Sequence, residues 1–382
     1  MIGRFNRMSL AAAVLAAASF AVPAGTANEA PFHWAGLGWQ MPLIVALVAV
    51  AAALLGLRGD RRELADAVAA IVVVAIGAAL LPGLLDADSD VEMDFGAAAP
   101  ALWIFLLALT VLAWRALEIL AAVRSPRWIA ALVVPGLFGV WLLFLWQVLV
   151  VGFDVPRVLL PSPSRIAHVF IVNIGQLWLD FRQTFLKSVL AGFALGSAAG
   201  FITAVLVDRS SFLQRGLLPL GSLVSSIPIV GIAPIMVMWF GFDWQSKAAV
   251  IVVMTFFPML VNTLAGLQSA GDIERDLMRS YGASYVQTLA KLRLPNALPF
   301  IFNALKINST LALIGAIVAE FFGTPVVGLG FRISVEIGRM NVDVVWAAIA
   351  VAALAGSAFY GILALLERGL TFWHPSYRQG QS

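Results

Sequence analysis

The chain has 382 residues, of which 61% are hydrophobic and 12% charged, and its mean hydropathy is +0.95. This composition excludes a soluble globular domain and is typical of a polytopic membrane protein. The net charge of +3 gives no indication of a nucleic-acid partner, and the absence of cysteine excludes disulfides.

Ten apolar runs follow one another along the chain. Each is long enough, or nearly so, to cross a hydrocarbon core of about 30 Å as a helix. Backbone polar groups find no water in lipid, so helices are the spanning structure that suits these runs. We therefore predict an all-α fold with nine or ten transmembrane helices. The runs cover residues 8–24, 41–57, 66–85, 100–122, 128–151, 183–207, 217–240, 246–266, 303–322 and 345–367.

The first run has two interpretations. Arg4 and Arg7 precede it and Gly25-Thr26-Ala27 follows it, as in a secretory signal with a small-residue cleavage site. The alternative is an uncleaved first transmembrane helix. Residues 1–27 are therefore predicted to be a signal peptide or a first helix, and both leave the second run starting outside the membrane.

Lysine and arginine are distributed unevenly between the loops. If the chain starts inside, the inside loops hold fifteen of these residues and the outside loops hold five. This asymmetry satisfies the positive-inside rule and places residues 267–300 and the C-terminus in the cytoplasm. The inside residues are Arg4, Arg7, Arg58, Arg61, Arg62, Arg124, Arg127, Arg209, Arg215, Arg275, Arg279, Lys291, Arg293, Arg368 and Arg378, and the outside residues are Arg157, Arg165, Arg182, Arg332 and Arg339.

The chain is predicted to divide at residues 124–127, Arg-Ser-Pro-Arg. Residues 28–127 hold three apolar runs and residues 128–382 hold six. Between positions 86 and 94 lies a predicted outer loop with five carboxylates. A calcium loop would need glycine in place of Val91 and glutamate in place of Ala97, so we interpret this segment as an acidic, solvated loop.

The most informative segment is residues 276–295, DLMRSYGASYVQTLAKLRLP, which is charged and amphipathic within an otherwise apolar chain. Apolar side chains recur every four residues and form one stripe. Gly282 lies in the middle, where a helix can turn. We predict a helix–turn–helix that docks a soluble partner; the alternative is an amphipathic helix lying on lipid. The stripe consists of Ile273, Leu277, Tyr281, Tyr285 and Leu289.

The spacing in this segment resembles the cytoplasmic loop of ABC-type import permeases. The family pattern is Glu-Ala-Ala, three residues, Gly, nine residues, an aliphatic residue, any residue and Leu-Pro. Gly282, Leu292, Leu294 and Pro295 match it, whereas the opening triplet, Asp276-Leu277-Met278, departs from it but keeps the acid. Further motifs over residues 128–375 resemble the nitrate, sulfonate and taurine branch. They are Leu160-Pro161-Ser162-Pro163-Ser164, Ile227-Pro228 with Ala233-Pro234, Trp239-Phe240-Gly241, Ala319-Glu320-Phe321 and Gly328-Leu329-Gly330.

The resemblance implies a six-helix permease domain at residues 128–382, with residues 28–127 as an extension that the family core does not require. It also implies a bacterial inner-membrane location, a second permease copy, a cytoplasmic ATPase and an external solute-binding protein. The chain has no G-x-x-x-x-G-K-S/T motif, so ATP and Mg are expected on the ATPase. This chain is then a transport subunit, not an enzyme, with no cofactor or metal of its own.

The resemblance also implies which residues couple the chain to the ATPase. The apolar docking face is expected to contain Leu277, Met278, Tyr281 and Tyr285. The whole coupling loop consists of Asp276, Leu277, Met278, Arg279, Ser280, Tyr281, Gly282, Ala283, Ser284, Tyr285, Leu294 and Pro295.

A candidate translocation path follows from polar residues in apolar runs. Pro219, Pro228 and Pro234 interrupt residues 217–240, and interrupted membrane helices occur where they line a cavity or are packed in protein. The candidate path consists of Ser225, Ser226, Asn262, Asn308, Ser309 and Thr310.

Two charged residues near these runs have other expected roles. Lys306 is expected to extend to the inner membrane interface rather than bind solute. Glu320 is expected to be a structural acid at the outer surface, paired with Arg332 or Arg339.

The family branch implies import of nitrate, a sulfonate, taurine or a similar small organic anion. A pyrimidine-type vitamin precursor is the alternative, because similar permeases carry such solutes. A secondary transporter without an ATPase is disfavoured because no inverted repeat is visible. A membrane enzyme is disfavoured because no H-E-x-x-H or G-x-S-x-G motif is present.

Overall fold

The structure is a computed structural model. It describes residues 6–27, 30–34, 40–57, 64–85, 93–94, 99–122, 132–210, 212–217, 219, 227–323 and 327–373. The chain forms two compact units, Met1–Arg165 and Ile166–Ser382. The division predicted at residues 124–127 lies outside the described residues and stays a prediction.

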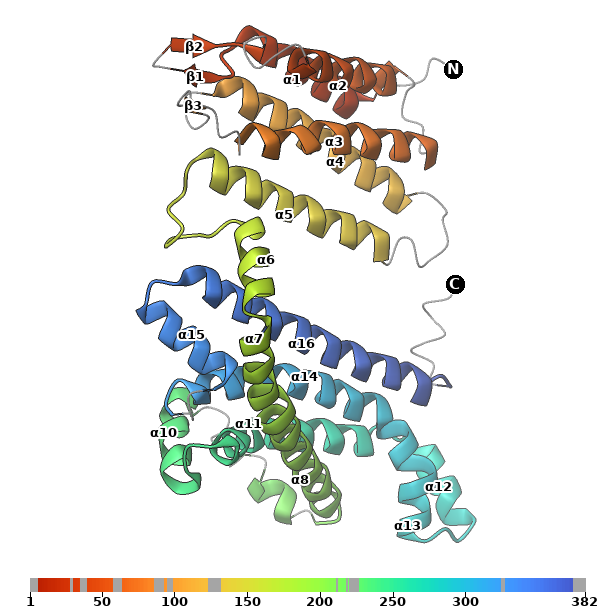
Figure 1. The fold of residues 1–382 in the computed structure, drawn as a ribbon. Coiled ribbons are helices and arrows are strands. Elements are labelled where there is room, and N and C mark those ends of the chain that lie inside the picture. Colours follow the sequence, from red (N-terminus) through yellow and green to blue (C-terminus); the bar gives the residue numbers. More distant parts are fainter. Residues whose placement is uncertain are drawn as a thin grey trace. The chain divides into compact units, whose positions relative to one another are not determined.

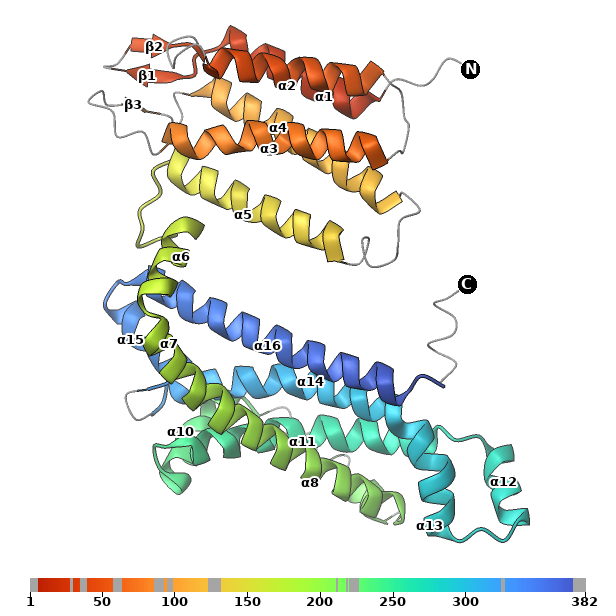
Figure 2. The same cartoon turned by 45° about the vertical axis from the view of Figure 1, so that its right-hand side comes forward.

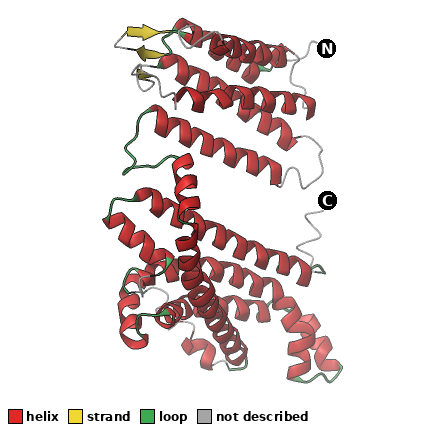
Figure 3. Ribbon diagram, in the orientation of Figure 1, coloured by secondary structure: helices red, strands yellow, loops and turns green. Residues whose placement is uncertain are grey.

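The described part of the N-terminal unit is a set of apolar helices with a small sheet at one end (Figure 1). The strands pair antiparallel in the order β2-β1-β3, and they are the yellow arrows of Figure 3. The elements are α1 (Arg7–Ala18), the 3-10 turn η1 (Ser19–Ala21), β1 (Gly25–Ala27), β2 (Ala30–Phe32), α2 (Gln40–Leu57), α3 (Leu64–Leu85), β3 (Met93–Asp94), α4 (Pro100–Ala122) and α5 (Val134–Gly152).

Small residues allow α1 to pack closely against α2 and α4. Ala12 and Ala16 are fully buried there. Trp34 donates its indole N–H to the Ser19 carbonyl at 3.1 Å and meets Phe105 edge-on, with ring centroids 5.8 Å apart. Helix α1 is therefore an integral part of the packed N-terminal unit.

The C-terminal unit contains two long helical paths in which α-helices are joined through π-helical turns (Figure 2). One path runs from α7 through η4 to α8, and the other from α13 through η5 to α14. The elements are α6 (Pro163–Val172), α7 (Ile174–Phe181), η4 (Arg182–Val189), α8 (Leu190–Asp208), α10 (Ile229–Phe240), α11 (Trp244–Gln268), α12 (Asp272–Ser280), α13 (Tyr285–Thr288), η5 (Leu289–Arg293), α14 (Leu294–Glu320), α15 (Leu329–Gly338) and α16 (Val342–Leu370).

Helix α11 forms the centre of the C-terminal unit and packs against both α8 and α14. Three glycines spaced four residues apart, Gly192, Gly196 and Gly200, give α8 a flat face toward α11. A side chain at Gly196 would overlap the Thr255 hydroxyl. Membrane helices use such small residues to bring their backbones close, because lipid offers no hydrophobic drive for their association.

Six described helices are long and apolar enough to cross a membrane, as judged by length and composition. Shorter apolar helices lie at four other predicted runs: Arg7–Ala21, Met41–Leu55, Ala65–Ala79 and Ile229–Phe240. The helical architecture predicted from the sequence is confirmed. The small sheet was not predicted, because strands of two or three residues are too short to show alternation. The six long apolar helices are Pro100–Ala122, Val134–Gly152, Ile174–Asp208, Trp244–Gln268, Tyr285–Glu320 and Val342–Leu370.

Candidate functional site

Helix α12 projects from the rest of the C-terminal unit (Figure 2), and none of its residues is buried. Ile273 and Tyr281 are 86% and 81% exposed, and Leu277 is 55% exposed. Asp272 and Glu274 lie in the first turn, where negative charge is favourable to the helix dipole. The result is an apolar surface bordered by charge, as expected for a helix that enters a groove of another protein.

The polar residues of α12 contribute little to holding it in place. Arg279 lies 3.4 Å from Asp276, and both side chains are largely exposed, so this pair is worth about 0–1 kcal/mol. Ser280 donates its hydroxyl to the Leu277 carbonyl at 2.8 Å. Met278 is half-buried. These side chains leave the outer surface of α12 available to a partner.

The turn after α12 depends on Gly282, which has a φ of +66°. Its N–H donates to the Arg279 carbonyl at 2.9 Å, and the Ala283 N–H donates to the Met278 carbonyl at 3.0 Å. Bonds of this kind close a helix C-terminus through a left-handed residue, a conformation that glycine adopts without a Cβ penalty. The predicted turn at Gly282 is confirmed.

A capping box starts α13 directly after the turn. Ser284 accepts a hydrogen bond from the Gln287 N–H at 3.3 Å, and Gln287 accepts one from the Ser284 N–H at 2.8 Å. This reciprocal pair satisfies two backbone donors that would otherwise lack partners. The short helix α13 is thus held at its N-terminus by its own side chains.

Tyr285 is half-buried, unlike Ile273, Leu277 and Tyr281 of the same predicted stripe, and its role in docking stays a prediction. Its hydroxyl donates to Asp208 at 3.2 Å, and the Arg209 guanidinium carbon lies 5.3 Å from its ring centroid. The left-handed turn changes the helix direction, so the four-residue spacing does not continue across Gly282. Val286, 69% exposed, takes the outward position instead. Starting the four-residue spacing again after the turn predicted at Gly282 could have identified Val286 as the outward residue.

An ion pair that was not predicted from the sequence lies behind this segment. Arg293 forms two parallel hydrogen bonds with Asp208, at 2.7 and 2.6 Å. Its Nε donates to the Leu267 carbonyl at 2.9 Å. The family pattern allows any residue at position 293, and Arg293 and Asp208 are 85 positions apart in the sequence. No local signal therefore pointed to this pair.

Leu294 and Pro295 form the first turn of α14. Proline is well accommodated there because the first helical N–H groups have no partner within the helix. Leu294 packs against the buried cluster that contains Leu267 and Ala297. The Leu-Pro of the family pattern therefore anchors the return of the coupling loop to the helices.

The candidate path residues lie in different environments. Ser225 and Ser226 are outside the described residues. Asn308 is fully buried and donates to the Ser197 hydroxyl at 3.0 Å and the Thr255 carbonyl at 2.8 Å, so it joins α14 to α8 and α11. Ser309 is also buried, with its hydroxyl donating to the Lys306 carbonyl.

Other polar residues share an accessible surface of α14 and α11. Thr310 is exposed, and its hydroxyl donates to the Ile307 carbonyl at 2.8 Å. Asn303 is also exposed, and its amide donates to Asn262 on α11 at 3.3 Å. Asn262, Asn303 and Thr310 are therefore the described polar groups that a solute beside α14 could meet.

Lys306 forms an ion pair that was not predicted, and its extension to the inner membrane interface stays a prediction. It lies 2.7 Å from Glu367 on α16, and both side chains are largely buried. The pairing was not visible in the sequence because 61 positions separate the two residues.

Glu320 is buried rather than at the outer surface, and its predicted pairing with Arg332 or Arg339 is wrong. It is 2% exposed and accepts hydrogen bonds from the Thr184 hydroxyl at 2.8 Å and the Gly330 N–H at 2.7 Å. Arg332 instead contacts Asp180 at 2.9 Å. The two acids therefore hold the segment around Gly330.

Asp180 and Thr184 complete this arrangement. Asp180 accepts from the Gly328 N–H at 2.9 Å, and Thr184 accepts from the Leu329 N–H at 2.8 Å. Gly328 has a φ of +146°, and a Cβ there would lie 2.7 Å from the Glu320 carboxylate carbon. The Gly-Leu-Gly motif is thus explained by direct contact with these buried side chains.

Nearby, a hydrogen bond from Gln183 holds the pKa of Asp243 below its usual value.

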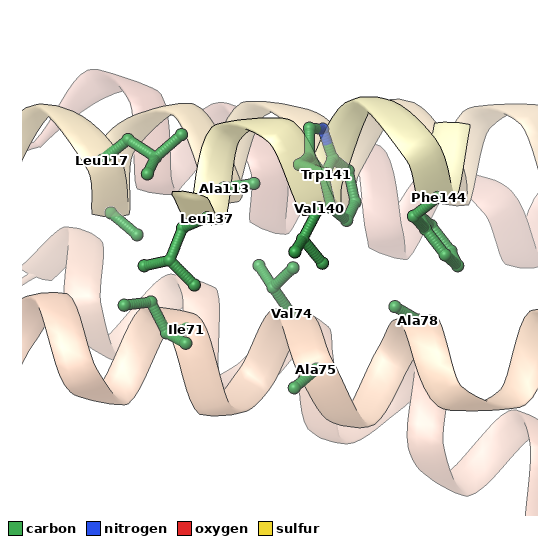
Figure 4. A pocket seen from close by; sticks show the side chains of 11 residues that line it. Ile71, Val74, Ala75, Ala78, Ala113, Leu117, Leu137, Val140, Trp141 and Phe144 are labelled. Carbon is green, nitrogen blue, oxygen red and sulfur yellow. The ribbon is translucent and has the colours of Figure 1, made fainter. Parts of the chain in front are cut away.

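The N-terminal unit contains an apolar cavity of about 190 Å³ between α3, α4 and α5. Ile71 and Val74 of α3 point toward Leu137 and Val140 of α5 (Figure 4). The other lining residues are Ala75, Ala78, Ala113, Ala116, Leu117, Trp141 and Phe144. With so few polar atoms in its lining, this cavity does not suit a polar solute.

Among the described residues, no group of three or more His, Cys, Asp or Glu side chains could hold a metal ion. The geometry shows an exposed, amphipathic segment that projects from a set of apolar helices (Figure 2). This arrangement is the one expected of the membrane subunit of a transporter.

Comparison with known proteins identifies the family. Residues 196–372 match the family model described as "Binding-protein-dependent transport system inner membrane component". The chain is 34% identical over 240 residues to the riboflavin transport system permease protein of Chloroflexus aurantiacus, covering 62% of this chain and 88% of the relative. It is 32% identical over 239 residues to the formylaminopyrimidine transport permease protein of Halalkalibacterium halodurans, covering 63% and 95%. It is 29% identical over 246 residues to the taurine transport system permease protein of Escherichia coli, covering 63% and 88%.

The chain belongs to this family of binding-protein-dependent inner-membrane permeases. It is a multi-pass permease subunit of an ABC importer, and the ATPase is a separate subunit. The resemblance inferred from the sequence is confirmed.

Proposed function

We propose that residues 272–286 form the coupling element on which the partner ATPase seats. The observation that carries this proposal is the exposed apolar surface of Ile273, Leu277, Tyr281 and Val286 on a projecting, capped segment. Burial of two or three such side chains is worth about 1.5–3 kcal/mol each, which is enough to hold a complex. ATP-driven closure of the ATPase then moves the helices attached to this element.

In this proposal the chain works as one of two identical permease subunits, and an external binding protein delivers the solute. The C-terminus and residues 267–300 face the cytoplasm, which is supported by the excess of Lys and Arg in those loops. ATP and Mg bind to the partner ATPase, and this chain contributes no cofactor. Residues 28–127 form a membrane extension of the six-helix permease domain.

We propose that solute passes along the accessible surface of α14. Asn303 and Thr310 lie on this surface, and Asn262 of α11 is joined to Asn303 by a hydrogen bond. Ser225 and Ser226 remain candidate members of the path. Asn308 and Ser309 are assigned to helix packing instead, because both side chains are buried within the unit.

Two substrate classes are compatible with this path, and we place a pyrimidine-type vitamin precursor or flavin first. The riboflavin and formylaminopyrimidine permeases are 34% and 32% identical to this chain, against 29% for the taurine permease. Asn262, Asn303 and Thr310 are neutral, and Lys306 is neutralised by Glu367. Neutral amides that both donate and accept suit a heteroaromatic ring with both kinds of group. A small organic anion such as taurine or another sulfonate is second.

Uptake by the complete importer in proteoliposomes separates the two classes. We expect ATP-dependent accumulation of radiolabelled formylaminopyrimidine or riboflavin. Accumulation of taurine alone would transfer the assignment to the anion class. Accumulation driven only by an ion gradient would contradict ATPase coupling itself.

Capture of the ATPase tests the coupling element. Tyr281→Ala removes an aromatic side chain that is 81% exposed at the C-terminal end of α12. We expect it to reduce the copurifying ATPase at least tenfold, since a lost anchor of about 1.5–3 kcal/mol corresponds to tenfold or more. Tyr360→Ala is the matched control, because Tyr360 is an exposed tyrosine on α16, away from this element. Equal capture by both variants would contradict the proposal.

A further inference from the structure

Within the described residues, the coupling element continues as unbroken helix into only one of the long helices behind it. Helix α13 continues through η5 into α14, so a movement of α13 reaches α14 through the chain itself. Helix α11 ends at Gln268 and is joined to α12 by the short loop of residues 269–271, whereas α8 ends at Asp208 and has no such link. A movement that enters through α13 therefore reaches the end of α8 through side-chain contacts, and it reaches the end of α11 through both side-chain contacts and the loop to α12.

Arg293 makes those contacts on both sides. Its two terminal nitrogens hold both carboxylate oxygens of Asp208, at 2.7 and 2.6 Å, and its Nε holds the Leu267 carbonyl at 2.9 Å. Tyr285 adds a hydrogen bond to the same carboxylate at 3.2 Å. One guanidinium therefore joins the start of α14 to the ends of α8 and α11.

The contacts of Arg293 with Asp208 and with the Leu267 carbonyl form a stiff junction. The Arg293 and Asp208 side chains are 12% and 3% exposed, so water competes little for their hydrogen bonds. A bidentate guanidinium–carboxylate pair fixes orientation as well as distance. The exposed pair Asp276–Arg279 on α12, with a single 3.4 Å contact, has neither property.

We propose that Arg293 is a positioning residue for transport that transmits movement of the coupling element to the inner ends of α8 and α11. Asp208 receives this movement for α8, and Tyr285 provides a second link to it. This inference rests on the proposed docking of the ATPase on α12 and α13. Without the junction, the ATPase would still bind and still move α14, but α8 would no longer follow.

The chemistry of the junction predicts which substitutions break it. Arg293→Lys keeps the positive charge but has no planar fork, so it cannot hold both oxygens of Asp208 and the Leu267 carbonyl together. Asp208→Asn keeps the shape and loses the charge. Tyr285→Phe removes one hydroxyl and leaves the ion pair, so its effect should be the smallest.

Hydrogen–deuterium exchange on the complete complex tests the proposal without a transported solute. Exchange is measured with and without trapping by ATP and vanadate, in peptides covering residues 200–208 and 272–288. We expect both peptides to respond in the wild-type complex. In Arg293→Lys and Asp208→Asn the response of 272–288 should be retained and that of 200–208 lost. In Tyr285→Phe the response of 200–208 should fall at least twofold, which provides a readout if the stronger variants do not assemble.

Glu367→Gln is the matched control, because it removes another largely buried ion pair of α14, with Lys306, that holds α16 rather than α8. We expect its 200–208 peptide to respond as in the wild type. A full response of 200–208 in Arg293→Lys, or the same loss in Glu367→Gln, would overturn the transmission role. No response of 272–288 in the wild type would instead overturn the docking proposal on which it rests.

Discussion

The two units of this permease are both made of apolar helices, but they bury different chemistry. Among the described residues, five buried polar or charged side chains lie in the N-terminal unit and fifteen in the C-terminal unit. The N-terminal core consists mainly of alanine, valine and leucine side chains. The C-terminal unit adds bonds between distant residues, such as Thr184 to Glu320 and Ser197 to Asn308.

This difference indicates how each unit specifies its packing. Apolar contacts in the N-terminal unit depend on volume and tolerate changes that conserve it. Hydrogen bonds in the C-terminal unit depend on direction, and a partner left alone in a buried site is costly. The family motifs Ala-Glu-Phe and Gly-Leu-Gly lie on these directional contacts, which accounts for their particular residue types.

The largest expected effect comes from removing the buried hydrogen bonds that Glu320 accepts. Glu320→Ala leaves the Thr184 hydroxyl and the Gly330 N–H without their buried acceptor, and we expect a loss of about 3 kcal/mol or more in the free energy of unfolding. Thermal unfolding of the purified protein in detergent measures this loss. Glu320→Gln, which keeps an acceptor oxygen, should lose less. Equal stability of Glu320→Ala and the wild type would show that these bonds do not specify the unit.

Overpacking of α1 tests the volume-dependent N-terminal unit. Ala16 is fully buried, so Ala16→Leu should lower the free energy of unfolding by about 1–3 kcal/mol, whereas Ala17→Leu on the exposed side should have little effect. The same thermal unfolding assay measures both.

The experiment also decides between the two interpretations of residues 1–27. A mature protein that lacks them by mass spectrometry, with no effect of Ala16→Leu, would identify a cleaved signal.

The smallest effect is expected at the turn of the coupling element. No atom lies within 4 Å of a Cβ built on Gly282, so Gly282→Ala meets only backbone strain, of about 1 kcal/mol. We expect unchanged global unfolding and about fivefold weaker capture of the ATPase, which is the affinity change that 1 kcal/mol produces. Gly231→Ala is the control, since a Cβ is also in open space there but φ is not positive. Identical capture by the two variants would contradict the need for a left-handed turn.

Much of the architecture follows from local features of the sequence. Apolar runs of about twenty residues predicted the helices, because a membrane leaves the backbone no other way to satisfy its polar groups. The spacing from Gly282 to Pro295 predicted the coupling loop, and the turn at Gly282 followed from the freedom of glycine. These features act over a few residues and need no knowledge of the rest of the fold.

The partners of the buried charges were decided only by the tertiary structure. Arg293 meets Asp208, Lys306 meets Glu367, and Glu320 meets Thr184, each across 61 to 136 positions. The sequence by itself determined that this chain is an apolar, multi-pass permease with a charged, amphipathic loop between two of its helices. Which charges pair, and whether Tyr285 packs against Asp208, depends on how the helices come together. A low-dielectric interior makes electrostatic energies sensitive to distances that no local pattern contains.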